Sequence, residues 1–486
     1  MRADDTMRAD DTMRADDTMR ADDTMRADDT MRADDMVTAD VCVIGAGMAG
    51  LVIAAETAAA GLRTVLVEAS GQVGGMLAPI GVGGLTVDAG AESFATRTDA
   101  VTDLIGQWHL PVAVTTPNPA GAWLVAAGDA GVTRAPLPRR SVLGIPADPD
   151  ADDIAPLFPG RSEKLLPVPA EEPSLFELVA SRLGPDLADT LVDTVCRGVY
   201  SRPSRDLKLS VVHPQLWRRF SQTGSLTGAV AELAAGPRPG SAVAGIVGGM
   251  WRLPRELASR ARAAGATILM DAPVRSIQGA GAAGASDDAV IVDAGSTPIR
   301  ARTVVVATGR EEALRLLGSA ADGDGTPVEL AIALVHAPGL DAHPVGTGAL
   351  IADAAPIDAK ALTHANAKWA WVDDALSERL GPHHHIVRLS ARDGAADAFD
   401  EESVAAAITA VTGVTVAPVD VRELHIRRWH ASSSSSSVSA VAADSRIYLA
   451  GATVAGTGLA SVIPHAREVA ASLVRALAAP PLASAS

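Results

Sequence analysis

Apolar runs separated by glycine turns open the patterned part of the chain. Residues 40–44 and 64–67 are apolar runs of the length typical of buried strands. Between them stand the sequence GAGMAG, residues 45–50, and an alanine-rich stretch, which together predict a glycine turn and then a helix. The acidic residue Glu68 follows the second strand directly. Strand, glycine turn, helix, strand and acid in this order predict a dinucleotide-binding unit.

Each of the three glycines in this unit has a separate physical role. Gly45 permits the tight turn, Gly47 lets the backbone approach a pyrophosphate, and Gly50 lets the helix pack closely on the strand. The N–H groups at the helix N-terminus are then available to the phosphates. Glu68, 18 residues after Gly50, is placed to accept hydrogen bonds from an unmodified ribose hydroxyl pair.

A second glycine cluster follows the acid. Residues 71–76 are GQVGGM, and the chain continues with short strand-like pieces interrupted by glycine where a nicotinamide dehydrogenase would have a helix. The glycine pair at residues 74–75 lets the backbone approach a large cofactor a second time. This pattern favours FAD over NAD.

Strand and helix patterns alternate along the rest of the chain. The clearest are helices over 175–183 and 186–195, strands over 267–269, 272–277 and 301–309, and a closing strand over 446–451 whose helix runs to about residue 477. This alternation predicts an α/β fold.

Composition restricts the partners and the location. A formal charge of −17 argues against a nucleic-acid partner and against general attraction to anionic membranes. No apolar stretch reaches the roughly 18 residues of a spanning helix, and the N-terminus has no signal-peptide core. The two cysteines, Cys42 and Cys196, form no spacing motif. We therefore expect no membrane span and a cytoplasmic protein.

The N-terminus is a repeat. Residues 1–35 are MRADDT five times and then MRADD, a segment without apolar surface to bury. We expect it to be disordered. An acidic functional tail is one interpretation, but we favour a repeat expansion upstream of a true start at a later methionine such as Met36.

Several motifs together resemble one enzyme family. VIGAGMAGL, VEAS, VGG and GLTVDAGAESF resemble the FAD-dependent amine oxidase superfamily, and DAGAESF followed by Arg97 resembles its bacterial porphyrinogen oxidases. CRGVY at residues 196–200, GGMWRLP at 248–254, VVVATG at 304–309 and the AG-x(4)-GTG pattern at 450–458 are similar to further family segments in the same order. The resemblance covers nearly the whole chain after the repeat.

The resemblance implies a set of FAD contacts and a division of the α/β chain into a Rossmann-like FAD-binding domain, an interleaved α+β substrate domain and a helical insertion. The cofactor-binding residues that it implies, together with those of the opening motif, are Gly45, Gly47, Met48, Ala49, Gly50, Glu68, Ala69, Gly74, Gly75, Val274, Thr308, Gly309, Gly451, Val462 and Ile463. The expected segments are the repeat at 1–35, the FAD-binding domain at 36–95, 216–310 and 441–486, a helical substrate-pocket insertion at 96–215, and a substrate domain at 311–440.

The implied reaction is the oxidation of a porphyrinogen. Relatives remove six electrons in three flavin cycles, and O2 reoxidises the flavin and gives H2O2. The bacterial branch without a membrane-facing stretch oxidises coproporphyrinogen III to coproporphyrin III, and a downstream ferrochelatase is a candidate partner. Such chemistry needs no catalytic metal or nucleophile. It needs basic residues for the substrate carboxylates, for which Arg97 is the first candidate and Arg139 and Arg467 are weaker ones.

Three departures from the family pattern bear on activity. Met76 stands where relatives have a basic residue, and Ala452 stands where they often have an acid. Six serines, residues 432–437, replace a family segment near the substrate. Alternatives therefore stay open: a protoporphyrinogen IX oxidase, another flavin amine oxidase or desaturase, a binding protein on the same fold, or an FAD-binding paralogue without turnover.

Three consecutive histidines, residues 383–385, invite a metal interpretation. Neighbouring side chains of a strand alternate between its faces, so these three cannot all face one ion. We expect a turn that leads into a strand over residues 386–389.

Overall fold

The structure is a computed structural model. It describes residues 36–128, 131–200, 202–234, 243–279, 289–295, 297–319, 326–395, 397–431 and 446–478. The N-terminal repeat and the serine run lie outside the described residues, and so do the predictions made for them.

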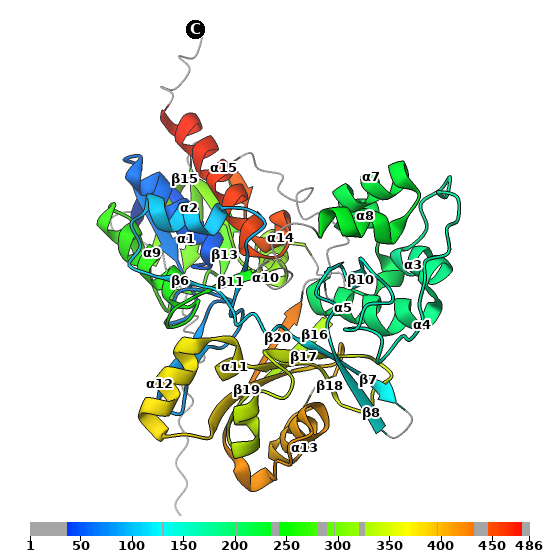
Figure 1. Cartoon of the computed structure of the whole chain (residues 1–486). Helices are drawn as coiled ribbons and strands as arrows, with labels where there is room; N and C mark the ends of the chain where they lie inside the picture. The colour runs from blue at the N-terminus through cyan, green and yellow to red at the C-terminus, as the bar shows by residue number, and fades with distance from the viewer. Residues whose placement is uncertain are drawn as a thin grey trace, which may run out of the picture.

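A seven-stranded sheet carries the glycine motif (Figure 1). Its strand order is β12-β2-β1-β15-β14-β13, with β21 beside β15. The strands are β1 (Val37–Ile44), β2 (Thr64–Val67), β12 (Thr267–Leu269), β13 (Ser276–Gln278), β14 (Val290–Ala294), β15 (Thr297–Val306) and β21 (Ile447–Leu449). The strands β12, β2, β1, β15 and β21 pair in parallel, so their carboxyl ends meet at one edge of the sheet.

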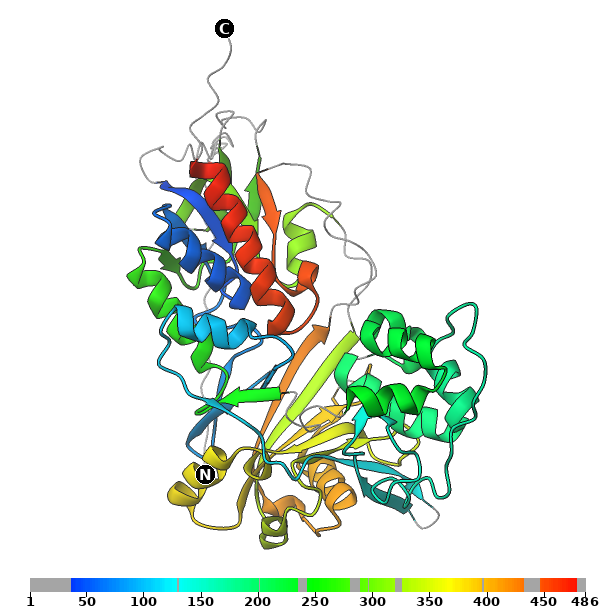
Figure 2. The same cartoon turned by 45° about the horizontal axis from the view of Figure 1, so that its top comes forward.

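Helices cover both faces of this sheet. They are α1 (Met48–Ala59), α2 (Ala100–Gln107), α9 (Arg252–Ala263), α10 (Arg310–Leu316), α14 (Ala452–Ala455) and α15 (Leu459–Ala478). Strand alternation places Val41 and Val43 in the core with α1, α9 and α15, and places Cys42 and Ile44 in the core on the opposite face. Burial on both faces explains why β1 is a continuous apolar run. Figure 2 shows the long α15 lying along α1.

A second seven-stranded sheet forms the lobe for which we predicted substrate binding, called the substrate lobe below. Its order is β20-β16-β19-β18-β17-β7-β8. The strands are β7 (Trp123–Gly128), β8 (Gly131–Pro136), β16 (Thr326–His336), β17 (Gly348–Ile351), β18 (Ala359–His364), β19 (His384–Ala391) and β20 (Val421–Ala431). Helix α13 (Glu401–Thr412) packs on one face, and α11 (Ala365–Lys368) and α12 (Ala370–Leu380) pack on the other.

A helical lobe lies beside the second sheet, where α5 contacts β17 (Figure 1). Its elements are α3 (Leu175–Leu183), α4 (Pro185–Leu187), the π-helix η2 (Ala188–Asp193), α5 (Thr194–Tyr200), the 3-10 turn η3 (Ser204–Asp206), α6 (Leu209–Val212), α7 (Pro214–Thr223) and α8 (Leu226–Leu233). Inside it, the buried Arg182 pairs with Glu163 and donates to the carbonyls of Leu166, Pro167 and Gly224. This lobe therefore has a core of its own, tied together by one satisfied buried charge pair.

Short strands connect the three parts. β3 (Pro79–Val82) pairs with β4 (Leu85–Asp88), β9 (Ser141–Val142) pairs with β10 (Ile145–Pro146), and β11 (Val243–Ile246) pairs with β5 (Phe94–Ala95) and β6 (Val114–Thr115). Two further 3-10 turns, η4 (Pro338–Ala342) and η5 (Pro418–Asp420), belong to the substrate lobe.

The structure divides residues 96–316 differently from the predicted segments. In the segment predicted as the helical insertion, 96–215, helix α2 packs in the core beside the first sheet, and β7 and β8 extend the second sheet. The helical lobe continues past residue 215 because α7 and α8 bury Phe220 and Val230 in the same core as α3. Helix α10 belongs to the first sheet, since Ala313 and Leu316 pack against it.

Among the described segments of the chain, none forms a helix that is both long enough and apolar enough to cross a bilayer.

Candidate functional site

The glycine turn after β1 has the geometry that its sequence predicts. Gly45 has φ +101°, which favours glycine, and its N–H donates to the carbonyl of Val67 at 2.8 Å. A Cβ on Gly50 would lie 1.9 Å from the carbonyl oxygen of Gly45, so the helix can pack on the turn only without that side chain. A Cβ on Gly47 would meet no described atom within 4 Å. The backbone at Gly47 is therefore open to a ligand at the start of α1.

The carboxylate of Glu68 lies over this turn. Its Oε2 accepts the N–H of Ala46 at 2.7 Å, and its Oε1 accepts the N–H and the hydroxyl of Ser70 at 2.9 and 2.8 Å. Ala69 follows it and is exposed. An acid at the carboxyl end of β2 beside the glycine turn is where a ribose hydroxyl pair is bound in dinucleotide folds.

The second glycine cluster lies against the first. Gly74 forms a parallel bridge with Gly47, and its N–H donates to the carbonyl of Ala46 at 2.9 Å. Both Gly74 and Gly75 have positive φ, and a Cβ on Gly75 would lie 3.6 Å from the Cα of Gly47. Two backbone segments without side chains therefore form one cradle at the start of α1.

The later motifs approach the same helix end. Gly451, at φ +90°, follows β21, and its added Cβ would lie 3.6 Å from that of Ala49. The hydroxyl of Thr453 donates to the carbonyl of Thr308 at 3.2 Å, which ties the end of β15 to α14. Gly309 precedes α10.

Four other predicted contacts are buried. Met48 and Ile463 lie in the core shared by α1 and α15, and Val462 lies beside Ile463 in the first turns of α15. Val274 is buried on the other face of the sheet, where its carbonyl accepts from Arg315 Nη2 at 2.6 Å. These residues can contact a cofactor through their backbone more readily than through their side chains.

The donor set fits a dinucleotide. The N-terminus of α1 follows β1, and the N-terminus of α14 follows β21. The glycine cradle and the acid Glu68 lie at the same edge of the sheet, at the carboxyl ends of these parallel strands. The first turn of α1 carries no acidic side chain that would repel a phosphate.

Arg97 lies beside the start of α15. It follows β5, and its Nη2 donates to the hydroxyl of Ser461 at 3.3 Å. The Arg97 side chain is exposed, so its guanidinium can donate hydrogen bonds to a further, anionic partner. The residue that the sequence favoured for a substrate carboxylate is thus the one that contacts the closing motif.

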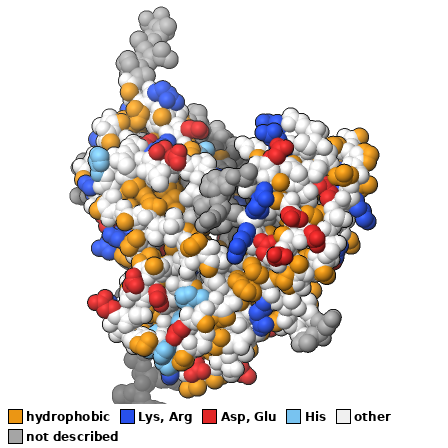
Figure 3. Space-filling view, in the orientation of Figure 1, with side chains coloured by type: hydrophobic (Ala, Val, Ile, Leu, Met, Phe, Trp, Pro, Cys, Tyr) orange, Lys and Arg blue, Asp and Glu red, His pale blue; other side chains and the backbone are white. Residues whose placement is uncertain are grey.

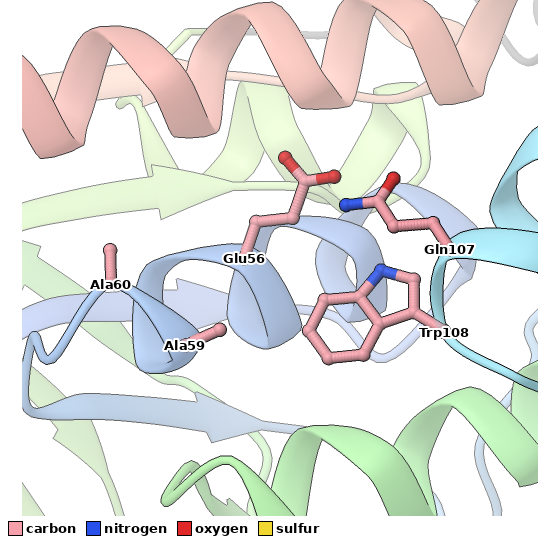
Figure 4. A pocket seen from close by; sticks show the side chains of 5 residues that line it. All are labelled: Glu56, Ala59, Ala60, Gln107 and Trp108. Atoms are coloured by element: carbon pink, nitrogen blue, oxygen red, sulfur yellow. The ribbon is translucent and has the colours of Figure 1, made fainter.

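The two weaker candidates for binding a substrate carboxylate, Arg139 and Arg467, do not lie beside Ser461 as Arg97 does. Arg139 is exposed, and its backbone N–H donates to Asp153 at 2.8 Å near the helical lobe. Arg467 pairs with Glu56 at 3.2 Å and donates to Gln107 at 2.5 Å. Figure 4 shows Glu56 and Gln107 converging with Trp108 at a shallow cavity of about 390 Å³ between α1 and α2. A substrate carboxylate at Arg467 would have to compete with Glu56.

The structure reveals a charge cluster that the sequence analysis did not single out. Glu92, four residues after the end of β4, pairs with Lys368 at 2.5 Å and with Arg388 at 2.8 Å. Although burial opposes ionisation of Glu92, the two cations lower its pKa to about 2. Both cations come from the substrate lobe, more than 270 residues further along the chain.

Asp88 is buried next to this cluster. Its carboxylate accepts the N–H groups of Met250 and Trp251, both at 2.9 Å, and so caps the start of α9. Burial raises the pKa of Asp88 to about 6, although these hydrogen bonds and Arg388 oppose that rise. Asp88 is therefore the weaker acid of the two neighbouring carboxyl groups.

The histidines of the substrate lobe form a hydrogen-bonded chain. His364 Nε2 lies 3.0 Å from His385 Nδ1, and Asp341 joins His385 to His383 at 3.1 and 2.6 Å. Figure 3 shows histidine side chains on the surface of this lobe. Pro382 and His383 form a turn before β19, as the sequence predicted, but the strand begins at His384, two residues earlier than predicted. Within the described ranges, no group of three or more His, Cys, Asp or Glu is arranged to hold a metal ion.

The fold and the site define a flavoprotein oxidoreductase. The family model for flavin-containing amine oxidoreductases matches residues 48–342, which is more than half of the chain. The chain belongs to this family, as its motifs predicted, and its cofactor is FAD.

Within the family, the chain is similar to porphyrinogen oxidases. It is 26% identical over 418 residues to coproporphyrinogen III oxidase of Mycobacterium leprae, which covers 80% of this chain and 86% of that one. It is 27% identical over 259 residues to human protoporphyrinogen oxidase, and this match covers 48% of this chain and 53% of the human protein. A solved structure from Exiguobacterium, provisionally named protoporphyrinogen oxidase, matches with a TM-score of 0.70 and 21% identity over 90% of this chain and 99% of that one. This last likeness confirms the mixed α/β fold.

Proposed function

We propose that the chain is an FAD-dependent coproporphyrinogen III oxidase of haem biosynthesis. In this proposal it removes six electrons from coproporphyrinogen III and gives coproporphyrin III, with O2 as the acceptor and H2O2 as the second product. FAD, when bound, supplies the acceptor for hydride equivalents from the substrate. A downstream ferrochelatase would consume the product, and a location in the cytoplasm stays a prediction.

One observation carries the proposal beyond FAD binding. Arg97 is an exposed cation held by Ser461 at the start of α15, beside the proposed flavin site. A porphyrinogen carries propionate groups, and a guanidinium binds a carboxylate through two parallel hydrogen bonds. An amine substrate would gain nothing from a cation at this position, because two positive charges repel.

The chain's own residues have distinct parts in this proposal. The glycine cradle at Gly47 and Gly74 binds the pyrophosphate of FAD, and Glu68 binds the ribose. Arg97 binds one propionate and so orients the macrocycle. We assign no acid–base residue, since the proposal needs a positioned substrate rather than a nucleophile.

The choice of coproporphyrinogen rests on the extent of similarity. The mycobacterial coproporphyrinogen III oxidase matches 80% of the chain, whereas the human protoporphyrinogen oxidase matches 48%. Protoporphyrinogen IX, with two propionates in place of four, is the second candidate substrate.

A direct competition tests the choice of substrate. Purified yellow holoenzyme is given each porphyrinogen in air, and porphyrin fluorescence and H2O2 are both followed. We expect a higher kcat/KM for coproporphyrinogen III and three H2O2 for each porphyrin. A higher kcat/KM for protoporphyrinogen IX would overturn the substrate, and no turnover of either would overturn the function.

A further inference from the structure

A short run of backbone contacts connects the glycine cradle to the loop that carries Glu92. The N–H of Gly74 donates to Ala46 in the first turn, and the N–H of Ala91 donates to the carbonyl of Met76 at 3.1 Å. A Cβ on Gly90 would lie 2.1 Å from that same carbonyl oxygen. No side chain fits at Gly90, so the loop before Glu92 is pressed directly onto the second glycine cluster.

The same loop is held from its other side by the substrate lobe. Arg388, on β19, donates through Nη2 to the carbonyl of Gly90 and through Nη1 to Glu92. Lys368, at the end of α11, donates to the other oxygen of Glu92 at 2.5 Å. The side chains of Glu92, Lys368 and Arg388 are exposed by only 14, 17 and 10%, so water screens these pairs little.

We propose that Glu92, Lys368 and Arg388 form an interlobe clamp that couples FAD occupancy of the glycine cradle to the position of the substrate lobe. The cradle, the Met76 turn, the Gly90 loop and β19 are consecutive partners in one chain of contacts. Binding FAD fixes the first member, and the clamp transmits that restraint to α11 and β19. These residues act through others, so they are positioning residues and not catalytic ones.

Charge balance explains why Glu92 is the centre of the clamp. Two cations from the substrate lobe face one carboxylate from the FAD-binding lobe, and Asp88 is the other acidic group near Arg388. Without Glu92, Lys368 and Arg388 would repel each other across a poorly hydrated interface. The lobe that carries them would then lose its attachment to the loop rather than only one hydrogen bond.

Hydrogen exchange with and without FAD tests the clamp. The inference rests on the proposed FAD contacts in the cradle and not on the substrate, so porphyrinogen is absent from the experiment. In the wild-type chain, FAD should slow amide exchange at residues 45–50 and also at residues 365–368 and 386–391. In Glu92→Gln, the protection at 45–50 should persist, and the distant protection should fall by about 5- to 150-fold.

A matched variant separates coupling from lost stability. Glu163→Gln removes a buried carboxylate that pairs with Arg182 inside the helical lobe, away from the cradle. It should lower stability and leave the distant protection by FAD intact. If Glu92→Gln does not fold, Lys368→Met serves in its place, because Arg388 still neutralises Glu92 there, and it should lose part of that protection.

Two kinds of result would contradict the clamp. Full distant protection in Glu92→Gln, or in Lys368→Met, would overturn the clamp. So would a wild-type chain in which FAD protects residues 45–50 alone. Because no substrate is used, either failure is independent of whether the protein oxidises a porphyrinogen.

Discussion

Arg97 and Ser461 are 364 positions apart in the chain, yet the guanidinium of one donates to the hydroxyl of the other at 3.3 Å. The bond joins the segment after β5 to the first turn of α15. An exposed hydrogen bond of this kind adds little to stability. Its consequence is orientation: it holds a cation beside the helix end that, in the proposed site, faces the flavin.

Replacing Arg97 by alanine should weaken substrate binding. The loss of a charged hydrogen bond corresponds to a rise in KM of about 10- to 100-fold, while the FAD content stays unchanged. Steady-state kinetics and the flavin absorbance of the purified variant measure the two quantities. A variant that loses its flavin would contradict the assigned role.

Arg467→Ala is the matched control for this prediction. Arg467 is already paired with Glu56 and Gln107, so its removal should leave KM unchanged. It should lower the free energy of unfolding by about 1 kcal/mol, because Glu56 is left half-buried without its cation. A large rise in KM here would restore Arg467 as a substrate ligand.

Gly47→Ala should separate cofactor binding from folding. The backbone at Gly47 has φ −71°, and an added Cβ meets no described atom within 4 Å, so the fold should tolerate alanine. A pyrophosphate at this backbone would clash with the new methyl group, so the purified variant should contain much less FAD. Gly106→Ala, at an exposed position of α2, is the control and should keep its flavin. Full FAD occupancy in Gly47→Ala would contradict the proposed cradle.

Asp88 should make stability depend on pH. Its pKa is raised from 3.8 to about 6, so the folded chain binds more protons than the unfolded chain between these values. The contribution of Asp88 to the free energy of unfolding therefore falls as pH rises from about 4 to about 6, by at most about 3 kcal/mol. Glu92 has the opposite sign, because its lowered pKa stabilises the fold above about pH 4.5.

Asp88→Asn isolates the contribution of Asp88 to the pH dependence of stability, since asparagine does not titrate. Denaturant unfolding at pH 4, 5 and 6 should show wild-type stability falling relative to the variant as the pH rises. Their difference should be constant if the Asp88 pKa is in fact ordinary, and that result would contradict its burial as the controlling effect.

Local patterns allowed the FAD-binding half of the site to be predicted from sequence. The strand over 64–67, the turn at Gly45 and the acid Glu68 are contiguous in sequence and in space, so their spacing carries their geometry. The closing helix was predicted to run to about residue 477 and runs to Ala478. The family match over residues 48–342 confirms the predicted family and cofactor.

Long-range pairings could not be predicted in this way. Nothing near Lys368 or Arg388 in the sequence indicates that both face Glu92, because the contact depends on how two lobes pack. The placement of β7 and β8 in the substrate sheet was missed for the same reason: their partner β17 lies more than 200 residues later. The proline-rich sequence around β7 and β8 does not indicate locally that β7 pairs with β17.

Anaerobic mixing of the holoenzyme with coproporphyrinogen III tests the central claim most directly. We predict that the flavin absorbance bleaches and that porphyrin fluorescence appears when oxygen is admitted. Reduction of the same bound flavin by dithionite shows that it is competent. Flavin that dithionite bleaches but that neither coproporphyrinogen III nor protoporphyrinogen IX bleaches would contradict the assignment of this chain as a porphyrinogen oxidase.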